Sequence, residues 1–144
     1  MDLDAQGNAS TGLGIPKDER EKTTYDLLTG NASISDVVKE TNIPSLFIAP
    51  ASTDLSSIDV DLYDEKRRVV KLRDWFAKEK LDFDYILIDC PPSLNLLTIN
   101  SMVASNSVLV PLQAEFFALE GLSQLLLTVR DIRSKINQDL KIHG

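Results

Sequence analysis

Three aspartates stand where the sequence predicts the carboxyl ends of strands, and their side chains could hold a metal ion or meet a phosphate group. Asp2 and Asp4 lie at the start of the chain, and Asp89 ends the apolar run at 85–88. Parallel α/β sheets bind ligands beyond the carboxyl ends of their strands. Carboxylates that converge there beside flexible loops suit magnesium, which takes oxygen ligands and keeps several waters. The alternative is that all three are helix-capping or loop acids.

The run at 85–88 predicts a fully buried strand, because it is short, apolar and rich in β-branched and aromatic residues. Pro91 and Pro92 cannot lie within the helix that follows, which places the start of that helix near Ser93 as its N-cap. Asp89 is therefore either a ligand at a strand end or a cap of this helix. The residues alone leave both interpretations open.

The elements that must position these acids alternate between strands and helical patterns, which favours an α/β fold with a parallel sheet and helices on both faces. Further strands are predicted at 46–49, at 107–112 and from 140. Helices are predicted at 25–28, at 33–41 with Ser33 or Ser35 as N-cap, from 54 through the stripe of Val69, Leu72 and Phe76, at 93–103, and from about 117. The small residues at 9–17 predict a mobile loop or a short helix at a site. We expect the fold to be incomplete at both ends.

Length and composition set bounds on the class of protein. The 144 residues fit one domain, and the net charge of −7 argues against a nucleic-acid surface spread over this segment. The bases within 66–73 are flanked by acids at 64, 65 and 74 in a helical pattern, which favours a solvated mixed-charge face. A single cysteine excludes a disulfide framework, and no apolar run is long enough to span a bilayer, so a cytoplasmic location is expected.

Several catalytic patterns are absent from the sequence. There is no Gly-x-x-x-x-Gly-Lys-Ser/Thr loop, which grips phosphates in P-loop enzymes, and no Gly-x-Gly-x-x-Gly. His143, near the end of the chain, favours a surface or structural role over catalysis. Cys90, within a buried run and next to an acid, favours an inert core thiol over a nucleophile.

Three motifs, in order along the chain, resemble those of the ParA (Soj-like) partition ATPases, in the deviant Walker-type group that also holds the MinD ATPases. They are DLDAQGNASTGLG at 2–14, YILIDCPPSL with LTIN at 85–94 and 97–100, and EFFALEGLSQLL at 115–126. The match includes positions that are not hydrophobic and therefore is not explained by core packing alone. The resemblance implies a P-loop NTPase-like fold.

The resemblance also implies a function. Members of this family bind ATP and magnesium, dimerise around two nucleotides, bind DNA nonspecifically and are stimulated by a ParB-type centromere-binding protein, and they segregate chromosomes or plasmids. By this resemblance Asp4 is the catalytic acid that orients the attacking water, and Asp89 holds the magnesium, usually through water, at the start of switch II. Asp2, Gly7 and Asn8 fall in the cofactor-binding set, with Asp2 supporting the magnesium site.

The sequence departs from the family pattern at three places. Ala5 stands where the family usually has proline, the P-loop with its two lysines would precede Asp2, and the last third, with adenine contacts and DNA-binding bases, would follow Gly144. We therefore expect residues 1–144 to be the middle part of a single ParA-type nucleotide-binding domain, without measurable ATP affinity alone. Two alternatives remain: a regulatory remnant without ATPase activity, and, more weakly, a receiver-like phosphorelay domain.

The third motif has two interpretations. In the family this motif lies near the dimer face. By that interpretation the residues at the dimer face would be Phe116, Phe117 and the polar Glu115, Glu120 and Gln124. Phenylalanine and leucine at helical spacing more often form core, and the pattern favours the core.

Overall fold

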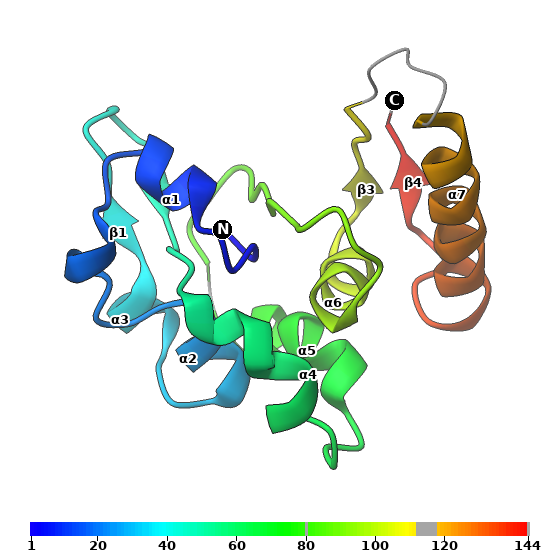
Figure 1. Cartoon of the computed structure of the whole chain (residues 1–144), viewed down its shortest axis with the longest axis horizontal. Coiled ribbons are helices and arrows are strands. Elements are labelled where there is room, and N and C mark those ends of the chain that lie inside the picture. The colour runs from blue at the N-terminus through cyan, green and yellow to red at the C-terminus, as the bar shows by residue number, and fades with distance from the viewer. Residues whose placement is uncertain (80, 112–117, 144) are drawn as a thin grey trace.

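The structure of the chain, a computed structural model, describes residues 1–79, 81–111 and 118–143 (Figure 1). Its α-helices are α1 (Asn8–Gly12), α2 (Thr24–Thr29), α3 (Ile34–Val37), α4 (Ile58–Asp61), α5 (Lys71–Lys78), α6 (Leu96–Ala104) and α7 (Ala118–Lys135). Short 3₁₀ turns are η1 (Lys17–Glu19), η2 (Thr53–Ser57) and η3 (Arg68–Val70). The strands are β1 (Lys39–Glu40), β2 (Phe47–Ile48), β3 (Ser107–Val108) and β4 (Lys141–Ile142).

The strands pair in short stretches. β1 and β2 are antiparallel, with Lys39 opposite Ile48, and β3 and β4 are parallel, with Ser107 opposite Lys141. Between these two pairs a parallel bridge joins Asp2 to Asp89. Parallel pairing of segments that are distant in sequence is the α/β arrangement predicted for the chain.

The main core lies beneath the first residues of the chain. It joins Leu3 to buried residues of α2, α4, α5 and α6, which are Leu28, Ile58, Leu72, Leu96 and Leu97. In Figure 1 these helices lie below the chain's N-terminus. Within the predicted stripe Leu72 is fully buried, and Val69 and Phe76 pack partly buried against the same cluster. The stripe therefore faces the core, as its helical spacing predicted, and its neighbours are mainly other helices.

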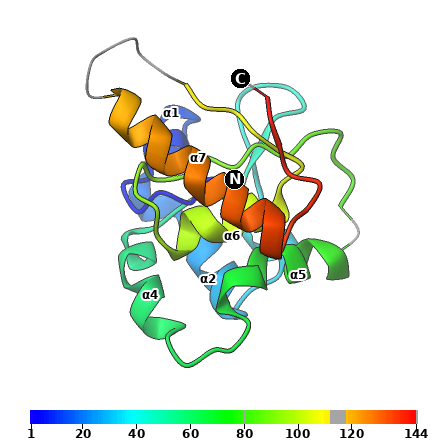
Figure 2. The ribbon, with the colours of Figure 1, turned by 90° about the vertical axis from the view of Figure 1, so that its right-hand side faces the viewer.

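A second core cluster fixes α7 to the rest of the molecule. Val129 and Ile132 of α7 are buried against Met102 and Val103 of α6, together with Leu140. Figure 2 shows α7 lying across α6. Asn137 strengthens this junction, because its side-chain amide donates to the carbonyl oxygens of Met102, Val103 and Ser105 at distances of 3.0, 3.3 and 2.8 Å. These carbonyls are among those that a helix C-terminus leaves without an intrahelical partner.

Two predicted buried strands are wrong in extent and in burial. The run at 85–88 forms no strand, and Asp89 after it makes only an isolated bridge. The run at 107–112 is a strand only at Ser107–Val108 among its described residues. Tyr85 and Leu87 are 89% and 81% exposed, and Leu109 is 70% exposed. The run at 85–88 meets a neighbouring backbone only near its end, because the Met1 amino group donates to the Leu87 carbonyl at 2.8 Å. Within the described part of the chain, no strand covers its remaining residues. Apolar content predicts that a run can be buried, but burial requires a neighbour.

The helix predictions were correct in place and wrong in several limits. Ser33 begins α3 as predicted, with its backbone N–H and hydroxyl both donating to Asp36, but the helix ends at Val37 and β1 follows. The pattern from 54 is broken into η2, α4, η3 and α5 rather than continuous. Asn95, and not Ser93, caps α6, because its side chain accepts from the N–H of Thr98 at 3.1 Å.

The mixed-charge face at 65–74 is confirmed. Arg67 pairs with Asp74, and Lys71 with Glu65, each at 2.6 Å. No helix in the described ranges combines the length and the apolar character needed to cross a membrane. The family-derived dimer face and its core alternative cannot be compared for residues 115–117, which lie outside the described residues.

Candidate functional site

The three predicted acids come together at one edge because the first residues of the chain lie between two other segments. On one side the N–H of Asp89 donates to the Met1 carbonyl at 2.9 Å, and the N–H of Leu3 donates to the Asp89 carbonyl at 2.8 Å. On the other side the N–H of Asp2 donates to the Ala49 carbonyl at 3.0 Å. Asp2, Asp4 and Asp89 thus lie where parallel strand ends meet, as the sequence predicted.

Asp2 is fully buried, and its carboxylate is occupied by the loop that follows it. One oxygen accepts from the N–H of Asp4 at 3.1 Å. The other accepts from the N–H and the hydroxyl of Ser10 at 2.8 and 2.6 Å. Thr24 adds a bond from its hydroxyl to the Asp2 carbonyl at 2.8 Å. A buried carboxylate with this many donors organises the loop around it.

Asp4 is partly buried at the start of a turn that leads into α1. Its side chain accepts from the N–H of Gln6 at 3.0 Å, and its carbonyl accepts from the N–H of Gly7 at 2.9 Å. Gly7 has a positive φ of 64°, and a Cβ there would lie 2.4 Å from a guanidinium nitrogen of Arg20. The positive φ favours glycine at this position, and a larger side chain would also displace the end of the Arg20 side chain. Asn8 begins α1 with its side chain exposed.

Asp89 is exposed, and its carboxylate accepts no hydrogen bond within the described part of the chain. Since Asn95 caps α6, Asp89 is not the cap of that helix. The pKa of Asp89 is raised, first by partial burial and then by the negative charges of Asp2 and Asp4. A divalent cation bound among these carboxylates would reduce the repulsion between their negative charges.

The carboxylates present fit a magnesium ion only with additional ligands. Among the described residues, no group of three histidine, cysteine or acidic side chains is close enough to hold a metal by itself. Magnesium usually takes one or two carboxylates and completes its shell with waters and substrate phosphates. Asp89, the free carboxylate of the three, is suited to such a site, whereas both oxygens of Asp2 are already engaged.

An apolar cavity of about 580 Å³ borders Asp89 and α1. Its lining includes Ala9 of α1, Leu13 directly after α1, and residues 81–87. Its described lining includes Asp82, Asp84 and Asp89 but no lysine or arginine. A phosphate site needs donors or positive charge. The described lining of this cavity is therefore acidic and offers no basic side chain to a phosphate.

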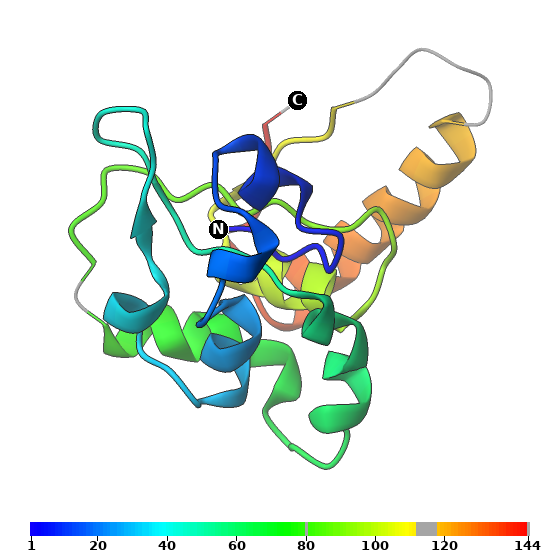
Figure 3. The ribbon, with the colours of Figure 1, turned by 60° about the vertical axis from the view of Figure 1, so that its left-hand side comes forward.

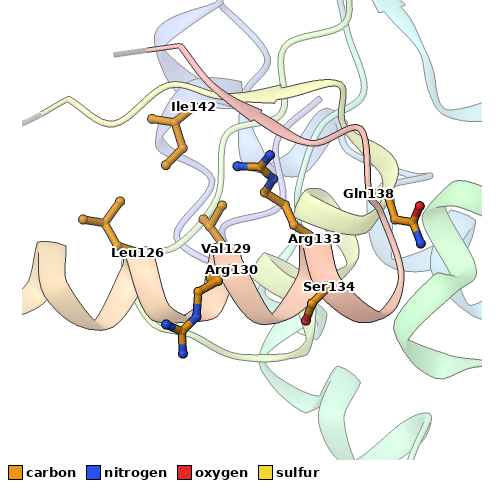
Figure 4. Close-up of a pocket in the computed structure, with 7 residues that line it drawn as sticks. All are labelled: Leu126, Val129, Arg130, Arg133, Ser134, Gln138 and Ile142. Carbon is orange, nitrogen blue, oxygen red and sulfur yellow. The ribbon is translucent and has the colours of Figure 1, made fainter.

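A second, shallower groove of about 350 Å³ lies between α7 and β4, away from the aspartates (Figure 4). It is lined by Leu126, Val129, Arg130, Arg133, Ser134, Gln138 and Ile142. Figure 4 shows Arg133 directed toward β4 and Arg130 directed away from it. None of the predicted site residues lies in this groove.

Three residues that surround the Asp4 turn were not predicted as members of the site. Ser10 and Thr24 bond to Asp2, and Arg20 donates to the carbonyl of Ala51 at 3.2 Å. Ser10 stands within the first motif, and this was the one available signal. Arg20 and Thr24 lie beyond it, where no local spacing indicates that the chain returns to Asp2.

The fold is an α/β fold of the P-loop NTPase type. The crystal structure of cobyrinic acid a,c-diamide synthase from Mycobacterium smegmatis, with bound ADP and magnesium, superimposes with a TM-score of 0.93 and 36% identity. That similarity covers 99% of this chain and 58% of the other.

Sequence comparison identifies the family. A family model described as AAA domain matches residues 1–142. The chromosome partitioning protein ParA of Caulobacter vibrioides is 47% identical over 146 residues, covering 100% of this chain and 55% of that protein. The chromosome-partitioning ATPase Soj of Treponema pallidum is 49% identical over 144 residues, covering 100% of this chain and 56% of its own length. The chain belongs to the AAA domain family, among the ParA (Soj-like) partitioning ATPases. It spans a little over half the length of these relatives.

Proposed function

We propose that residues 1–144 are the middle part of a single ParA-type nucleotide-binding domain and supply the magnesium-binding and water-orienting side of an ATPase site. The observation that carries this is the ladder that joins Met1–Leu3 to Asp89 and Ala49, because it brings Asp2, Asp4 and Asp89 to one edge. Phosphoryl transfer depends mainly on positioning and charge stabilisation, which such an edge provides.

Each acid has a separate part in this proposal. Asp89 holds the magnesium ion, through water, because its carboxylate is exposed and accepts no hydrogen bond in the described structure. Asp4 orients the attacking water from the turn that ends at Gly7. Asp2 supports the magnesium site from its buried position, and Gly7 and Asn8 belong to the cofactor-binding turn. Magnesium, when bound, neutralises charge that develops on the phosphate oxygens.

The process served is the partitioning of chromosomes or plasmids. The relatives at 47% and 49% identity carry partitioning names, and this supports the assignment over that of the synthase at 36%. In the intact protein, meaning the longer protein that contains this chain, we propose an ATP-dependent homodimer in the cytoplasm. It binds DNA nonspecifically through regions outside residues 1–144 and responds to a ParB-like partner.

The test is Asp4→Ala in the intact protein. Turnover of ATP is expected to be lost, while ATP-dependent dimerisation, measured by light scattering, is retained because the substitution removes no magnesium ligand. Unchanged turnover would refute the role of Asp4. For the isolated 144-residue chain we expect no measurable ATP binding by calorimetry, since the cavity beside Asp89 has no basic lining among the described residues. Micromolar binding by this chain would contradict that expectation.

A regulatory remnant without ATPase activity is the second candidate. The observation that favours it is the same acidic, base-free lining of the cavity beside Asp89 in the described structure. Sequencing the gene upstream of the Met1 codon separates the two candidates. An in-frame phosphate-binding loop there supports the ATPase, whereas a start codon with its own promoter supports the remnant.

A further inference from the structure

The short helix α1 is held by two charged side chains from outside it. Ser10, the buried residue of α1, is bound by the carboxylate of Asp2 through both its N–H and its hydroxyl. Thr11, its exposed neighbour, accepts a hydrogen bond on its hydroxyl from Arg20 at 2.8 Å. Figure 3 shows α1 beside the first residues of the chain. A helix of five residues is too short to be stable alone, so these contacts determine where it lies.

Both contacts lead to the backbone of Ala51. Its N–H donates to the Ser10 hydroxyl at 3.0 Å, and its carbonyl accepts from Arg20 at 3.2 Å. Ala51 is fully buried and belongs to the main core cluster. Through Ser10, which Asp2 holds, and through Arg20, α1 is therefore tied to the buried backbone of Ala51.

Arg20 is suited to this task by the shape of its guanidinium group. It is half-buried and donates twice to the Ile15 carbonyl, at 3.1 and 2.7 Å, besides its bonds to Ala51 and Thr11. No carboxylate pairs with it in the described part of the chain. Its donors thus bind carbonyl and hydroxyl groups in a fixed fork, which the ammonium group of lysine cannot reproduce.

We propose that Asp2 and Arg20 are positioning residues that clamp α1 to Ala51 and thereby fix the turn that presents Asp4. The clamp reaches Asp4 directly, because the backbone N–H of Asp4 donates to the Asp2 carboxylate at 3.1 Å. It also reaches the far end of the turn, where the Gly7 carbonyl lies 3.5 Å from a guanidinium nitrogen of Arg20. The effect on catalysis rests on the proposed function of Asp4, whereas the clamp itself does not.

The clamp is tested by hydrogen–deuterium exchange of the 144-residue chain. Ser10→Ala and Arg20→Lys each remove hydrogen bonds at one side of α1, and Arg67→Lys, at an exposed ion pair, is the matched control. We expect amides of residues 4–13 to exchange about tenfold faster in the first two variants and unchanged in the control. Amides of α6 should keep their wild-type rates. Equal acceleration in the turn and in α6, or no acceleration in either, would overturn the clamp.

The positioning role is tested by steady-state ATP hydrolysis in the intact protein. If the clamp orients Asp4, Ser10→Ala and Arg20→Lys lower kcat about tenfold and leave KM for ATP within about twofold, because transition-state stabilisation alone is lost. Faster exchange with an unchanged kcat would show a structural role only and overturn the proposal. A wild-type protein without ATPase activity would refute the proposed function instead, and the exchange result would still decide the clamp.

Discussion

Replacing Asn100 with alanine should strongly destabilise the chain, because this buried side chain joins α6 to the segment before α5. Its amide nitrogen donates to the carbonyls of Arg68 and Leu96 at 2.8 and 3.0 Å, and its oxygen accepts from the N–H of Leu72 at 3.2 Å. Asn100 is 1% exposed, so water cannot replace these bonds. The Leu96 carbonyl keeps its helical partner in α6 and the Arg68 carbonyl keeps its 3₁₀ partner in η3, whereas the Leu72 N–H, in the first turn of α5, has no helical partner.

One buried polar group, the Leu72 N–H, is therefore left without a partner in Asn100→Ala. This costs roughly 1–3 kcal/mol. For a domain of this size a loss of about 2 kcal/mol lowers Tm by about 6 °C. The assay is urea and thermal unfolding followed by circular dichroism. Asn106→Ala is the matched control, since the Asn106 side chain is exposed and makes no hydrogen bond in the described structure. A loss below about 1 kcal/mol, relative to this control, would refute the reasoning.

Three further predictions concern helix caps and the thiol. The Ser33 hydroxyl, and then its N–H, lower the pKa of Asp36. The stabilisation of α3 is therefore present above the unfolded-state pKa of about 3.9 and is lost as the pH falls through the lower folded-state pKa. Asp36→Asn should abolish this acid transition in the NMR shifts of α3, and an unchanged transition would contradict the prediction. Burial, foremost, raises the pKa of the Cys90 thiol, so alkylation by iodoacetamide at pH 8 should be slower in the native chain than in urea, and equal rates would be evidence against it. Asn95→Ala should lower the free energy of unfolding, measured in urea, by about 1 kcal/mol, and Ser93→Ala should leave it almost unchanged. The opposite order would show that Ser93 is the N-cap of α6.

The meeting of the three aspartates could be predicted from sequence because strand ends follow a general rule. An apolar run that stops at an acid places that acid at the carboxyl edge of a parallel sheet. Asp89 was assigned to that edge on this basis. Asp2, which no apolar run precedes, was assigned to it as a predicted strand end, and the bridge between the two acids confirms their proximity. Which of the acids is free could not be predicted, because the bonds of Asp2 come from Ser10, eight residues away.

The limits of elements and the burial of side chains were harder to predict. Two prolines placed the start of α6 near Ser93, yet the helix begins at Leu96, and the Asn95 side chain caps it. The apolar run at 85–88 has the composition of a buried strand but is exposed, since burial depends on which segments lie beside it. Arg20 gave no signal, because most of its partners are backbone carbonyls that any residue type could supply, and its one side-chain partner is the Thr11 hydroxyl.

The most direct test of the proposed site is to locate the metal in the intact protein. A crystal of that protein with manganese, in place of magnesium, and a non-hydrolysable ATP analogue gives an anomalous peak at the metal. We expect this peak beside the Asp89 carboxylate, joined to it directly or through one water, with the terminal phosphate facing Asp4. A metal bound to the nucleotide but remote from Asp89, with Asp4 turned away from the phosphate, would contradict the assignment of this acidic edge.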